Sequence, residues 1–215
     1  MKKIVVLISG GGTNLEAIAK ACQSGNIEGS IELVISNEPK AQGLERAKKY
    51  HLMTEVLDHS LFDSREVFDE ALIQMVLSAE PDLVILAGFM RVLSSTFTSQ
   101  LEGKLVNIHP SLLPEYPGLG THKQAMNNGD LMHGVTVHFV DEGVDTGPII
   151  AQAALKIEPD QTEKKLISRI HKIEHAIFPK VIGDISKDLI QLQSGKVLYS
   201  KKSYFRPNHM EFHNV

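Results

Sequence analysis

Asn107 and His109 are the residues of this sequence whose types and spacing best suit catalysis. They stand two positions apart in "NIHP", at the end of an apolar run that Pro110 terminates. Side chains two residues apart in a β-strand lie on the same face, so the amide and the imidazole would share one space. An amide N–H can bind a developing oxyanion, and an imidazole can donate to it or move a proton. The pair therefore suits acyl transfer, although both side chains could instead cap the strand end by hydrogen-bonding the Pro-rich loop that follows.

Three consecutive glycines, Gly10–Gly12, form a second candidate site. They stand between an apolar run and a stretch with helical spacing, and Thr13 and Asn14 follow them directly. The N–H groups of such a turn and the dipole of the next helix bind anions. The dinucleotide-binding fingerprint would need glycine in place of Leu15, and the phosphate loop of nucleoside triphosphatases would need a lysine. The loop therefore suits a single phosphate group; the alternative is that the glycines only permit a tight turn, with Thr13 as the helix N-cap.

The N-terminal half of the chain shows the alternation of elements that would position these residues. Short, largely apolar runs predict strands at 3–9, 31–36, 54–58, 82–88 and 104–109. Helical spacing predicts helices at 14–23, 41–50, 63–79 and 94–101. In the third of these helices, Asp63 and Glu66 are expected to form a capping box. Apolar strands without polar alternation, separated by amphipathic helices, are typical of a parallel sheet with both faces covered.

The pattern changes after residue 109. "HPSLLPEYPGLGTH" is rich in Pro and Gly and predicts a loop, followed by a short helix at 122–128. The stretches 133–140 and 149–157 flank a turn and predict an antiparallel pair. A long helix is expected at 162–185 and a peripheral strand or hairpin near 194–205. We therefore predict a single α/β domain with an open, mostly parallel, twisted, Rossmann-like sheet and an antiparallel C-terminal part.

Composition and charge exclude several classes of protein. The 215 residues are 42% apolar and 22% charged, as in ordinary globular domains, and the net charge of −4 with scattered Lys and Arg argues against a nucleic-acid surface. No apolar run approaches membrane length, and the N-terminal apolar stretch is too short for a signal peptide. The single Cys22 cannot form an internal disulfide. We expect a cytoplasmic protein with small-molecule substrates and no nucleic-acid or membrane partner; the sequence leaves its oligomeric state open.

The ten histidines raise the question of a metal site. Neither a His-Glu-x-x-His helix nor a paired cysteine set is present. His133 and His138 have opposite parity on one predicted strand and cannot face the same ion. His171 and His175 have helical i,i+4 spacing and could, but two ligands are weak evidence. We expect no metal.

Three stretches together carry a resemblance to a known family. "GGGTN", "NIHPSLLPEYPG" and "GVTVHFVDEGVDTGPI" resemble the folate-dependent formyltransferases, and the N-terminal loop resembles their glycinamide ribonucleotide transformylase branch. The resemblance extends to "PDLVILAGFMRVLS" and "EHAIFP" and covers nearly the whole chain. Relatives that act on methionyl-tRNA or hydrolyse formyl-tetrahydrofolate carry an extra domain, for which this chain has no room. The resemblance implies one formyltransferase domain over 1–215, with a phosphate-binding half at 1–103, a catalytic and folate-binding half at 104–190 and a peripheral tail at 191–215.

The resemblance also implies a reaction and a set of residues. A formyl group would pass from 10-formyltetrahydrofolate to the amine of 5′-phosphoribosylglycinamide (glycinamide ribonucleotide) in de novo purine biosynthesis, by direct attack through a tetrahedral intermediate. Asn107 and His109 would bind the formyl oxygen, and Asp145 would stand near His109 and accept the amine's proton. The implied substrate-binding residues are Gly12, Thr13, Asn14, His171 and Glu174. The implied folate-binding residues are Arg65, Met90, Arg91, Val92, Leu93, Asn107, Asp141 and Val144. The resemblance further implies a cis peptide at Leu113–Pro114.

Two positions depart from the family pattern. The family commonly has His where this chain has Gly120, and Gln where it has His171. The first departure removes an imidazole from the loop, and the second leaves the phosphate contact to His171 or removes it. Without the resemblance, Asp145 would be interpreted as a turn residue, and Arg65 and Glu174 as solvated helix charges. The alternative functions are a 10-formyltetrahydrofolate deformylase, which is a hydrolase, and a non-catalytic nucleotide- or folate-binding module.

Overall fold

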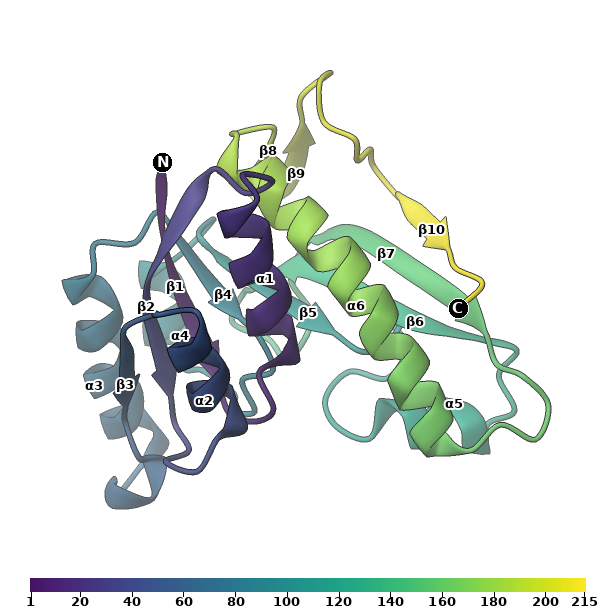
Figure 1. Cartoon of the computed structure of the whole chain (residues 1–215), viewed down its shortest axis with the longest axis horizontal. Coiled ribbons are helices and arrows are strands. Elements are labelled where there is room, and N and C mark those ends of the chain that lie inside the picture. The colour runs from purple at the N-terminus through teal and green to yellow at the C-terminus, as the bar shows by residue number, and fades with distance from the viewer.

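The computed structural model describes residues 1–215 as an eight-stranded sheet covered by helices on both faces, with a separate two-stranded hairpin (Figure 1). The strands of the large sheet are β1 Lys2–Ile8, β2 Gly29–Ser36, β3 Thr54–Val56, β4 Leu83–Leu86, β5 Leu105–His109, β6 Met132–Phe139, β7 Ile149–Lys156 and β10 Met210–Phe212. The helices are α1 Thr13–Gln23, α2 Gln42–Lys49, α3 Arg65–Ser78, α4 Ser95–Gln100, α5 Thr121–Asn127 and α6 Glu163–Ser186, with a 3₁₀ turn, η1, at His59–Leu61.

The order of the strands across the large sheet is β10-β7-β6-β5-β4-β1-β2-β3. All neighbouring pairs are parallel except those that β6 makes with β5 and β7. The predicted open, mostly parallel α/β sheet with an antiparallel C-terminal part is therefore confirmed. From β1 the chain moves to β2 on one side and later returns to β4 on the other, so the order of strands reverses between β1 and β4. Crevices at such a reversal are where open α/β sheets bind ligands.

Two hydrophobic cores lie on the two faces of the sheet. On β1, Ile4, Val6 and Ile8 belong to the core beneath α1, α2 and α6, while Val5 and Leu7 belong to the core beneath α3 and α4. All five side chains have no exposed surface. A strand that is buried on both faces needs apolar residues at every position, which explains why this run lacks polar alternation. None of the six α-helices combines the length and apolar character needed to cross a bilayer.

The start of α3 differs from our prediction. Its N-cap is Ser64, whose hydroxyl oxygen accepts a hydrogen bond from the Val67 N–H at 3.3 Å. The predicted capping box of Asp63 and Glu66 is wrong, because a cap at Ser64 places Val67 at the third helical position. Glu66 is exposed and pairs with Arg65 instead.

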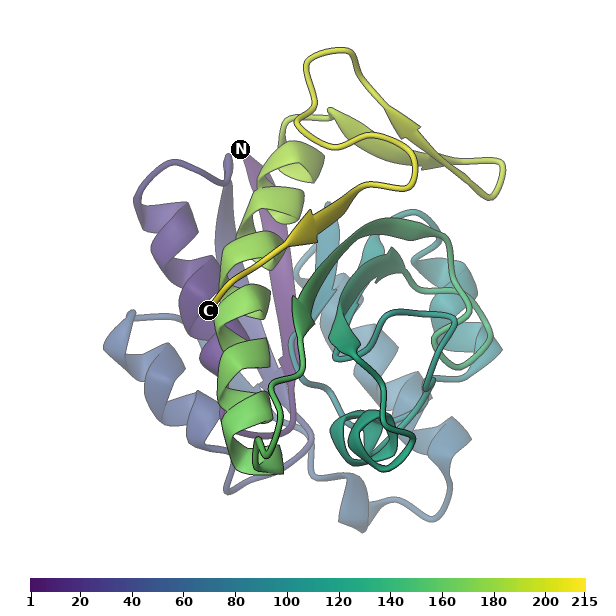
Figure 2. The same ribbon diagram turned by 90° about the vertical axis from the view of Figure 1, so that its right-hand side faces the viewer.

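The C-terminal segment is tied to the sheet more closely than the prediction of a peripheral tail implies (Figure 2). The hairpin begins earlier than expected, with β8 at Ile190–Gln193 and β9 at Lys196–Tyr199. Ser194 and Gly195 both have positive φ, the conformation that a two-residue hairpin turn favours. Beyond the hairpin, Phe205 is fully buried, and β10 pairs with β7 as an edge strand of the large sheet.

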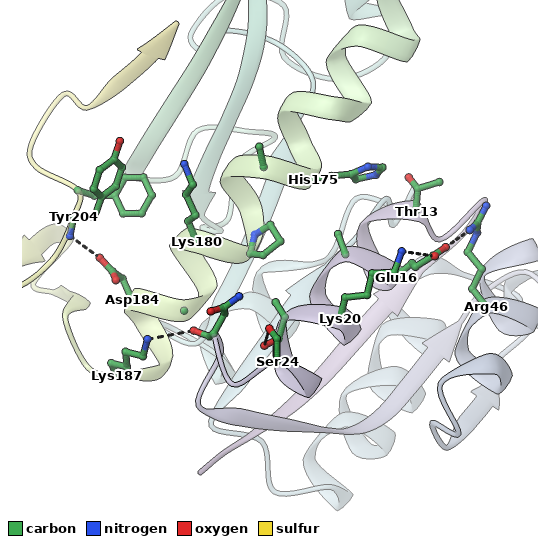
Figure 3. A pocket seen from close by; sticks show the side chains of 17 residues that line it. Thr13, Glu16, Lys20, Ser24, Arg46, His175, Lys180, Asp184, Lys187 and Tyr204 are labelled. Carbon is green, nitrogen blue, oxygen red and sulfur yellow. Dashed lines mark hydrogen bonds and ion pairs between the residues drawn. The ribbon is translucent and has the colours of Figure 1, made fainter. Parts of the chain in front are cut away.

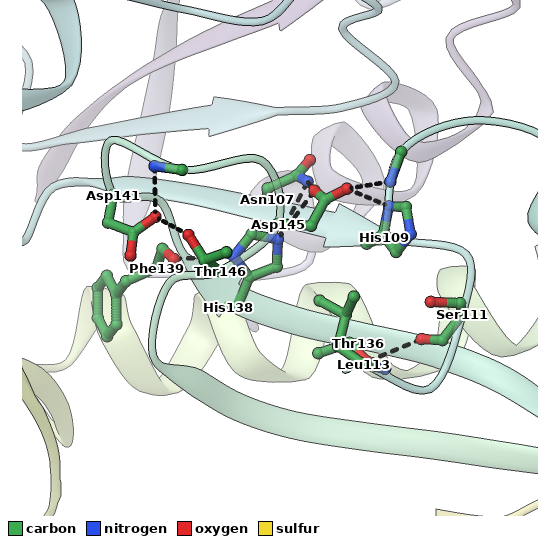
Figure 4. Close-up of polar contacts among 12 residues, drawn as sticks. Asn107, His109, Ser111, Leu113, Thr136, His138, Phe139, Asp141, Asp145 and Thr146 are labelled. Atoms are coloured by element: carbon green, nitrogen blue, oxygen red, sulfur yellow. Dashed lines mark hydrogen bonds and ion pairs between the residues drawn. The ribbon is translucent and has the colours of Figure 1, made fainter. Parts of the chain in front are cut away.

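The loop after β5 is anchored to β6. Leu113–Pro114 is a cis peptide, as expected. Thr136 on β6 donates to the Ser111 carbonyl at 2.7 Å and accepts from the Leu113 N–H at 3.0 Å (Figure 4). The Ser111 hydroxyl donates to the Glu115 carbonyl at 2.6 Å. These contacts fix the direction in which the chain leaves His109.

Candidate active site

A cavity of about 520 Å³ opens at the carboxyl ends of β1, β4 and β5. Its walls are the glycine loop after β1, residues 86–93 after β4, residues 107–110 at the end of β5, segments 118–122 and 138–145, and the α6 residues His171 and Glu174. Every residue that we predicted for the site lines this cavity except Arg65. The predicted positions thus converge although they are spread over more than 160 residues of sequence.

The three predicted catalytic residues meet at the end of β5 (Figure 4). The Nδ1 atom of His109 lies 3.2 Å from Oδ2 of Asp145, and Nδ2 of Asn107 donates to Oδ1 of Asp145 at 3.4 Å. Asp145 adopts a left-handed conformation with φ 55°, and its Oδ2 also accepts from the Gly118 N–H at 2.8 Å. Asp145 is therefore both part of a turn and a direct partner of the two β5 side chains.

His138 completes this group, and sequence reasoning missed it. Its Nδ1–H donates to the Phe139 carbonyl at 2.8 Å, so Nε2 is free to accept from Nδ2 of Asn107 at 3.2 Å. His138 is the cross-strand partner of Asn107 in the pairing of β5 with β6. The parity of His138 along its strand was the available signal, but it acquires meaning only when the register between the two strands is known.

The arrangement around Asn107 leaves one of its N–H bonds available for a ligand. Nδ2 of Asn107, Nε2 of His138 and Oδ1 of Asp145 form a triangle with sides of 3.2, 3.4 and 3.6 Å. Both acceptors thus lie on the same side of the amide nitrogen, where a single N–H bond can serve them. The second N–H bond diverges from the first and remains free beside the cavity.

Burial and neighbouring charges act in opposite directions on the two ionisable partners. Burial alone would raise the pKa of Asp145, but the hydrogen bond from the Gly118 N–H and the neighbouring His109 outweigh it and hold that pKa below its usual range. Burial lowers the pKa of His109, against the Tyr116 carbonyl and the Asp145 carboxylate, which both favour the charged ring. Asp145 is therefore ionised at neutral pH, while the net effect on His109 is a pKa below the usual histidine value.

The glycine loop forms one end of the cavity. Helix α1 starts from Gly12 without any side-chain cap, so the N–H groups of its first turn have no acceptor from this helix. The carbonyls of Gly10 and Gly11 are occupied on the other side by Gly43 N–H at 2.9 Å and Arg46 Nε at 2.8 Å. The loop thus presents backbone donors to the cavity, as a phosphate site requires.

Gly12, which lines the cavity, must also be glycine for packing. Its φ of 73° is left-handed, and a Cβ atom there would lie 2.4 Å from Cα of Gly43 in α2. The close packing of α1 on α2 therefore requires this glycine. At Gly10 and Gly11, by contrast, a Cβ atom would have no neighbouring atom within 4 Å, and both residues line the open cavity. A substitution that fills the space available to a ligand, without disturbing the packing of the helices, must therefore be made at Gly11 and not at Gly12.

Glu174 is buried, contrary to the interpretation of a solvated helix charge. Only 6% of its surface is exposed, and Asn14 Nδ2 donates to its Oε2 at 3.1 Å. Burial raises the pKa of Glu174 to about 7, because this single hydrogen bond offsets little of the cost of burying a carboxylate. The pair joins α6 to the start of α1, and His171, one turn earlier on α6, lines the same end of the cavity.

The other end of the cavity is apolar. Met90, Val92 and Val144 line it with 67, 49 and 45% of their surfaces exposed, while Leu93 is buried. The Arg91 guanidinium lies 4.9 Å from the centre of the Phe68 ring. Asp141 holds the neighbouring turn, since its Oδ1 accepts from the Gly143 N–H at 3.1 Å and the Thr146 hydroxyl at 2.7 Å.

Arg65 is the predicted site residue that the structure does not bring to the cavity. It is the first residue of α3, is exposed and contacts Glu66 at 3.3 Å. Its position at the start of a surface helix fits the alternative interpretation of a solvated charge.

A second cavity, of about 840 Å³, lies between α1 and α6 (Figure 3). Several of its charged side chains have partners: Glu16 contacts both Lys20 and Arg46, and Asp184 accepts a hydrogen bond from the Tyr204 backbone N–H at 3.0 Å. Although larger, this cavity does not contain the group formed by Asn107, His109 and Asp145, and no three His, Cys, Asp or Glu side chains anywhere in the chain group as metal ligands would.

The formyl transferase family model matches residues 2–182, which include the glycine loop, β5 and α6 as far as Ile182. The chain belongs to the formyl transferase family. It is 51% identical to the phosphoribosylglycinamide formyltransferase of Escherichia coli over 180 residues, covering 84% of this chain and 85% of that protein. The enzyme of the same name from Haemophilus influenzae is 44% identical over 90% of this chain and 91% of its own length.

Solved structures of this formyl transferase family agree with the fold along nearly the whole chain. The phosphoribosylglycinamide formyltransferase from Coxiella burnetii superposes with a TM-score of 0.90 at 41% identity, covering 98% of this chain and 99% of that one. Glycinamide ribonucleotide transformylase 1 from Symbiobacterium toebii also gives a TM-score of 0.90, at 40% identity over 94% of this chain and 95% of that one.

Proposed function

We propose that this protein transfers the formyl group of 10-formyltetrahydrofolate to the amine of glycinamide ribonucleotide. The observation that carries the proposal is the meeting of Asn107, His109 and Asp145 in one cavity between a backbone anion site and an apolar wall. The names of the similar family members described above support the choice of substrates. The reaction is one step of de novo purine biosynthesis.

The carbonyl chemistry falls to Asn107 and His109. When the amine nitrogen attacks the formyl carbon, a C–N bond forms and the formyl oxygen takes up negative charge. The free N–H bond of Asn107 donates to this oxyanion, and the ring of His109 stabilises it by charge once it holds a second proton beside Asp145. Loss of such a preorganised donor typically costs about 10²–10³-fold in rate.

The proton released by the amine goes to Asp145. The attacking nitrogen becomes positively charged as its bond to the formyl carbon forms, and Asp145 is the ionised carboxylate beside that bond. It accepts the proton directly or through one water molecule. When the tetrahedral intermediate collapses, the bond to N10 of the folate breaks and that nitrogen takes up a proton in turn. No covalent intermediate on the protein is needed.

The two ends of the cavity fit the two substrates. The single ribose 5′-phosphate lies against the N–H groups of the glycine loop with Thr13 and Asn14, and Glu174 and His171 of α6 border the ribonucleotide. The folate covers Met90, Val92 and Val144, three apolar side chains that are otherwise exposed. An aromatic bicyclic ring is the kind of ligand that such an apolar wall accepts.

The direct test is turnover with each substrate omitted in turn. The absorbance of the folate product should rise only when 10-formyltetrahydrofolate and glycinamide ribonucleotide are both present, and exhaustive dialysis against a chelator should leave the rate unchanged. Formation of folate product without the amine would indicate a deformylase. Loss of activity on chelation that a divalent ion restores would contradict the metal-free mechanism.

A further inference from the structure

The backbone of Tyr116 makes a contact with His109 that the mechanism above does not use. His109 Nε2 lies 2.8 Å from the Tyr116 carbonyl, while the other ring nitrogen, Nδ1, faces Asp145 at 3.2 Å. A carbonyl and an ionised carboxylate only accept hydrogen bonds. A neutral imidazole has one N–H and one lone pair, so its protonation pattern depends on which acceptor holds the proton more firmly. A proton on Nε2 would occupy the shorter of the two contacts, the one to the Tyr116 carbonyl.

The carbonyl of Tyr116 is held in place by the Tyr116 side chain. Tyr116 has φ 55°, a left-handed conformation that is unusual for a bulky residue and persists only where the surroundings impose it. Its hydroxyl donates to Oδ2 of Asp130 at 2.6 Å and accepts from Nδ2 of Asn128 at 2.9 Å. These two hydrogen bonds tie the loop after β5 to the segment that follows α5. Tyr116 itself does not line the cavity.

We propose that Tyr116, anchored by Asp130, is a positioning residue that keeps one ring proton of His109 on Nε2. Nδ1 is then the nitrogen that gains and loses a proton beside Asp145. The use of this proton in formyl transfer rests on the proposed function, whereas the placement of the ring proton does not. The arrangement parallels the way in which a hydrogen bond to one ring nitrogen selects the working nitrogen in other histidine sites.

Several other groups act on His109 and are shared by every variant below. They are Asp145 in the loop after β6, His138 and His133 on β6, and His122 on α5. None of them contacts Nε2, whose hydrogen-bond partner is the Tyr116 carbonyl. A change in the tautomer of His109 after an alteration at Tyr116 or Asp130 therefore reports on this carbonyl.

Nitrogen-15 NMR of the imidazole rings in the substrate-free, full-length protein tests the proposal. Chemical shifts of the two ring nitrogens distinguish the tautomers, and the spectrum of His109→Asn identifies the signals of His109. In the wild type, the neutral ring of His109 should carry its proton on Nε2.

Tyr116→Phe and Asp130→Ala remove the hydrogen bond between the Tyr116 hydroxyl and Asp130. Both variants should show a mixture of the two His109 tautomers. They should also lower the pKa of His109, because a displaced carbonyl favours the charged ring less. Their kcat should fall about tenfold with little change in either KM.

Two controls separate positioning from general loss of structure. Asp130→Asn keeps an acceptor oxygen for the Tyr116 hydroxyl and should retain the wild-type tautomer. Tyr199→Phe removes a hydroxyl hydrogen bond of similar length, 2.7 Å to the Ile150 carbonyl, from a residue outside the cavity, and should leave His109 unchanged. A neutral-state proton on Nδ1 in the wild type, or an unchanged tautomer and pKa in both Tyr116→Phe and Asp130→Ala, would overturn the proposal. An Nε2 proton in a protein without transferase activity would contradict the proposed function alone.

Discussion

At the scale of single residues, the site depends on what each ionisable group has as a neighbour. Asp145 and Glu174 are both carboxylates in the same cavity, yet their pKa values are displaced in opposite directions. Asp145 has a backbone N–H and two imidazoles around it, whereas Glu174 has one amide. The difference keeps Asp145 ionised at neutral pH and leaves Glu174 near its titration point there.

Asp145→Asn should separate chemistry from binding. The amide has nearly the shape of the carboxylate and tolerates the left-handed backbone at this position, so the melting temperature should change little. The variant cannot accept the amine's proton, and kcat should fall by ~10²–10⁴-fold while both KM values stay near wild type. Steady-state kinetics with each substrate varied provide the measurement. Retention of most of the kcat would mean that Asp145 is only a turn residue and that water removes the proton.

Glu174 should make the stability of the protein depend on pH. Its pKa of about 7 in the folded protein exceeds the unfolded value of 4.5, so between these values the folded state holds a proton that the unfolded state lacks. The free energy of unfolding should therefore be highest, with respect to this group, below pH 4.5 and should fall as the pH rises through 7. Glutamine cannot ionise, so Glu174→Gln should not lose this stability as the pH rises. The variant should therefore be more stable than the wild type by up to about 3 kcal/mol at pH 8.

Urea denaturation of Glu174→Gln and wild type at pH 4.5 and pH 8 measures this difference. The stabilisation should appear at pH 8 and largely vanish at pH 4.5. Glu70→Gln, on the exposed face of α3, is the matched control and should show no such pH-dependent gain. An equal effect of Glu174→Gln at both pH values would show that packing, not ionisation, causes it.

At the scale of elements, the glycine loop serves two purposes that single substitutions can separate. Gly11→Ala adds a methyl group to the cavity without meeting any protein atom, so it should raise the KM for the ribonucleotide several-fold and leave the melting temperature nearly unchanged. Gly12→Ala places Cβ 2.4 Å from Cα of Gly43 and strains a positive φ, so it should destabilise the fold by about 1–3 kcal/mol.

Differential scanning calorimetry measures the change in stability, and isothermal titration calorimetry with the ribonucleotide measures the change in binding. An analogue of 10-formyltetrahydrofolate that cannot transfer its formyl group serves as a control ligand. Folate-analogue binding to Gly11→Ala should match the wild type. If Gly11→Ala binds the ribonucleotide as well as the wild type does, the loop is a structural turn and the phosphate lies elsewhere.

The elements also show which parts of the structure the sequence could predict. Apolar runs and helical spacing located the strands and helices of the N-terminal half to within a few residues, because each of those patterns arises from burial within one element. His138 and Tyr116 were missed because their roles depend on the register of β6 and on the path of a loop. β10 was missed because its three residues form a strand only by pairing with β7.

At the scale of the whole molecule, the fold explains why residues so distant in sequence act together. β1, β4 and β5 are neighbours in the sheet and end at the same edge, so the glycine loop, the apolar segment 86–93 and the Asn107–His109 pair surround one cavity. Helix α6 then returns along the sheet and adds His171 and Glu174. The resemblance seen in the sequence located these contributors one by one, whereas the topology explains their convergence.

Transfer of an isotopic label tests the central claim most directly. The protein, in slight molar excess over the folate, should be mixed with glycinamide ribonucleotide and with 10-formyltetrahydrofolate that carries ¹³C in the formyl group. The position of the label should then be followed by ¹³C NMR. We predict that the label moves quantitatively to the amide of the formylated ribonucleotide, and that Asn107→Ala and His109→Ala slow this transfer without changing its product. Appearance of the label as formate, at the same rate with or without the ribonucleotide, would contradict the claim.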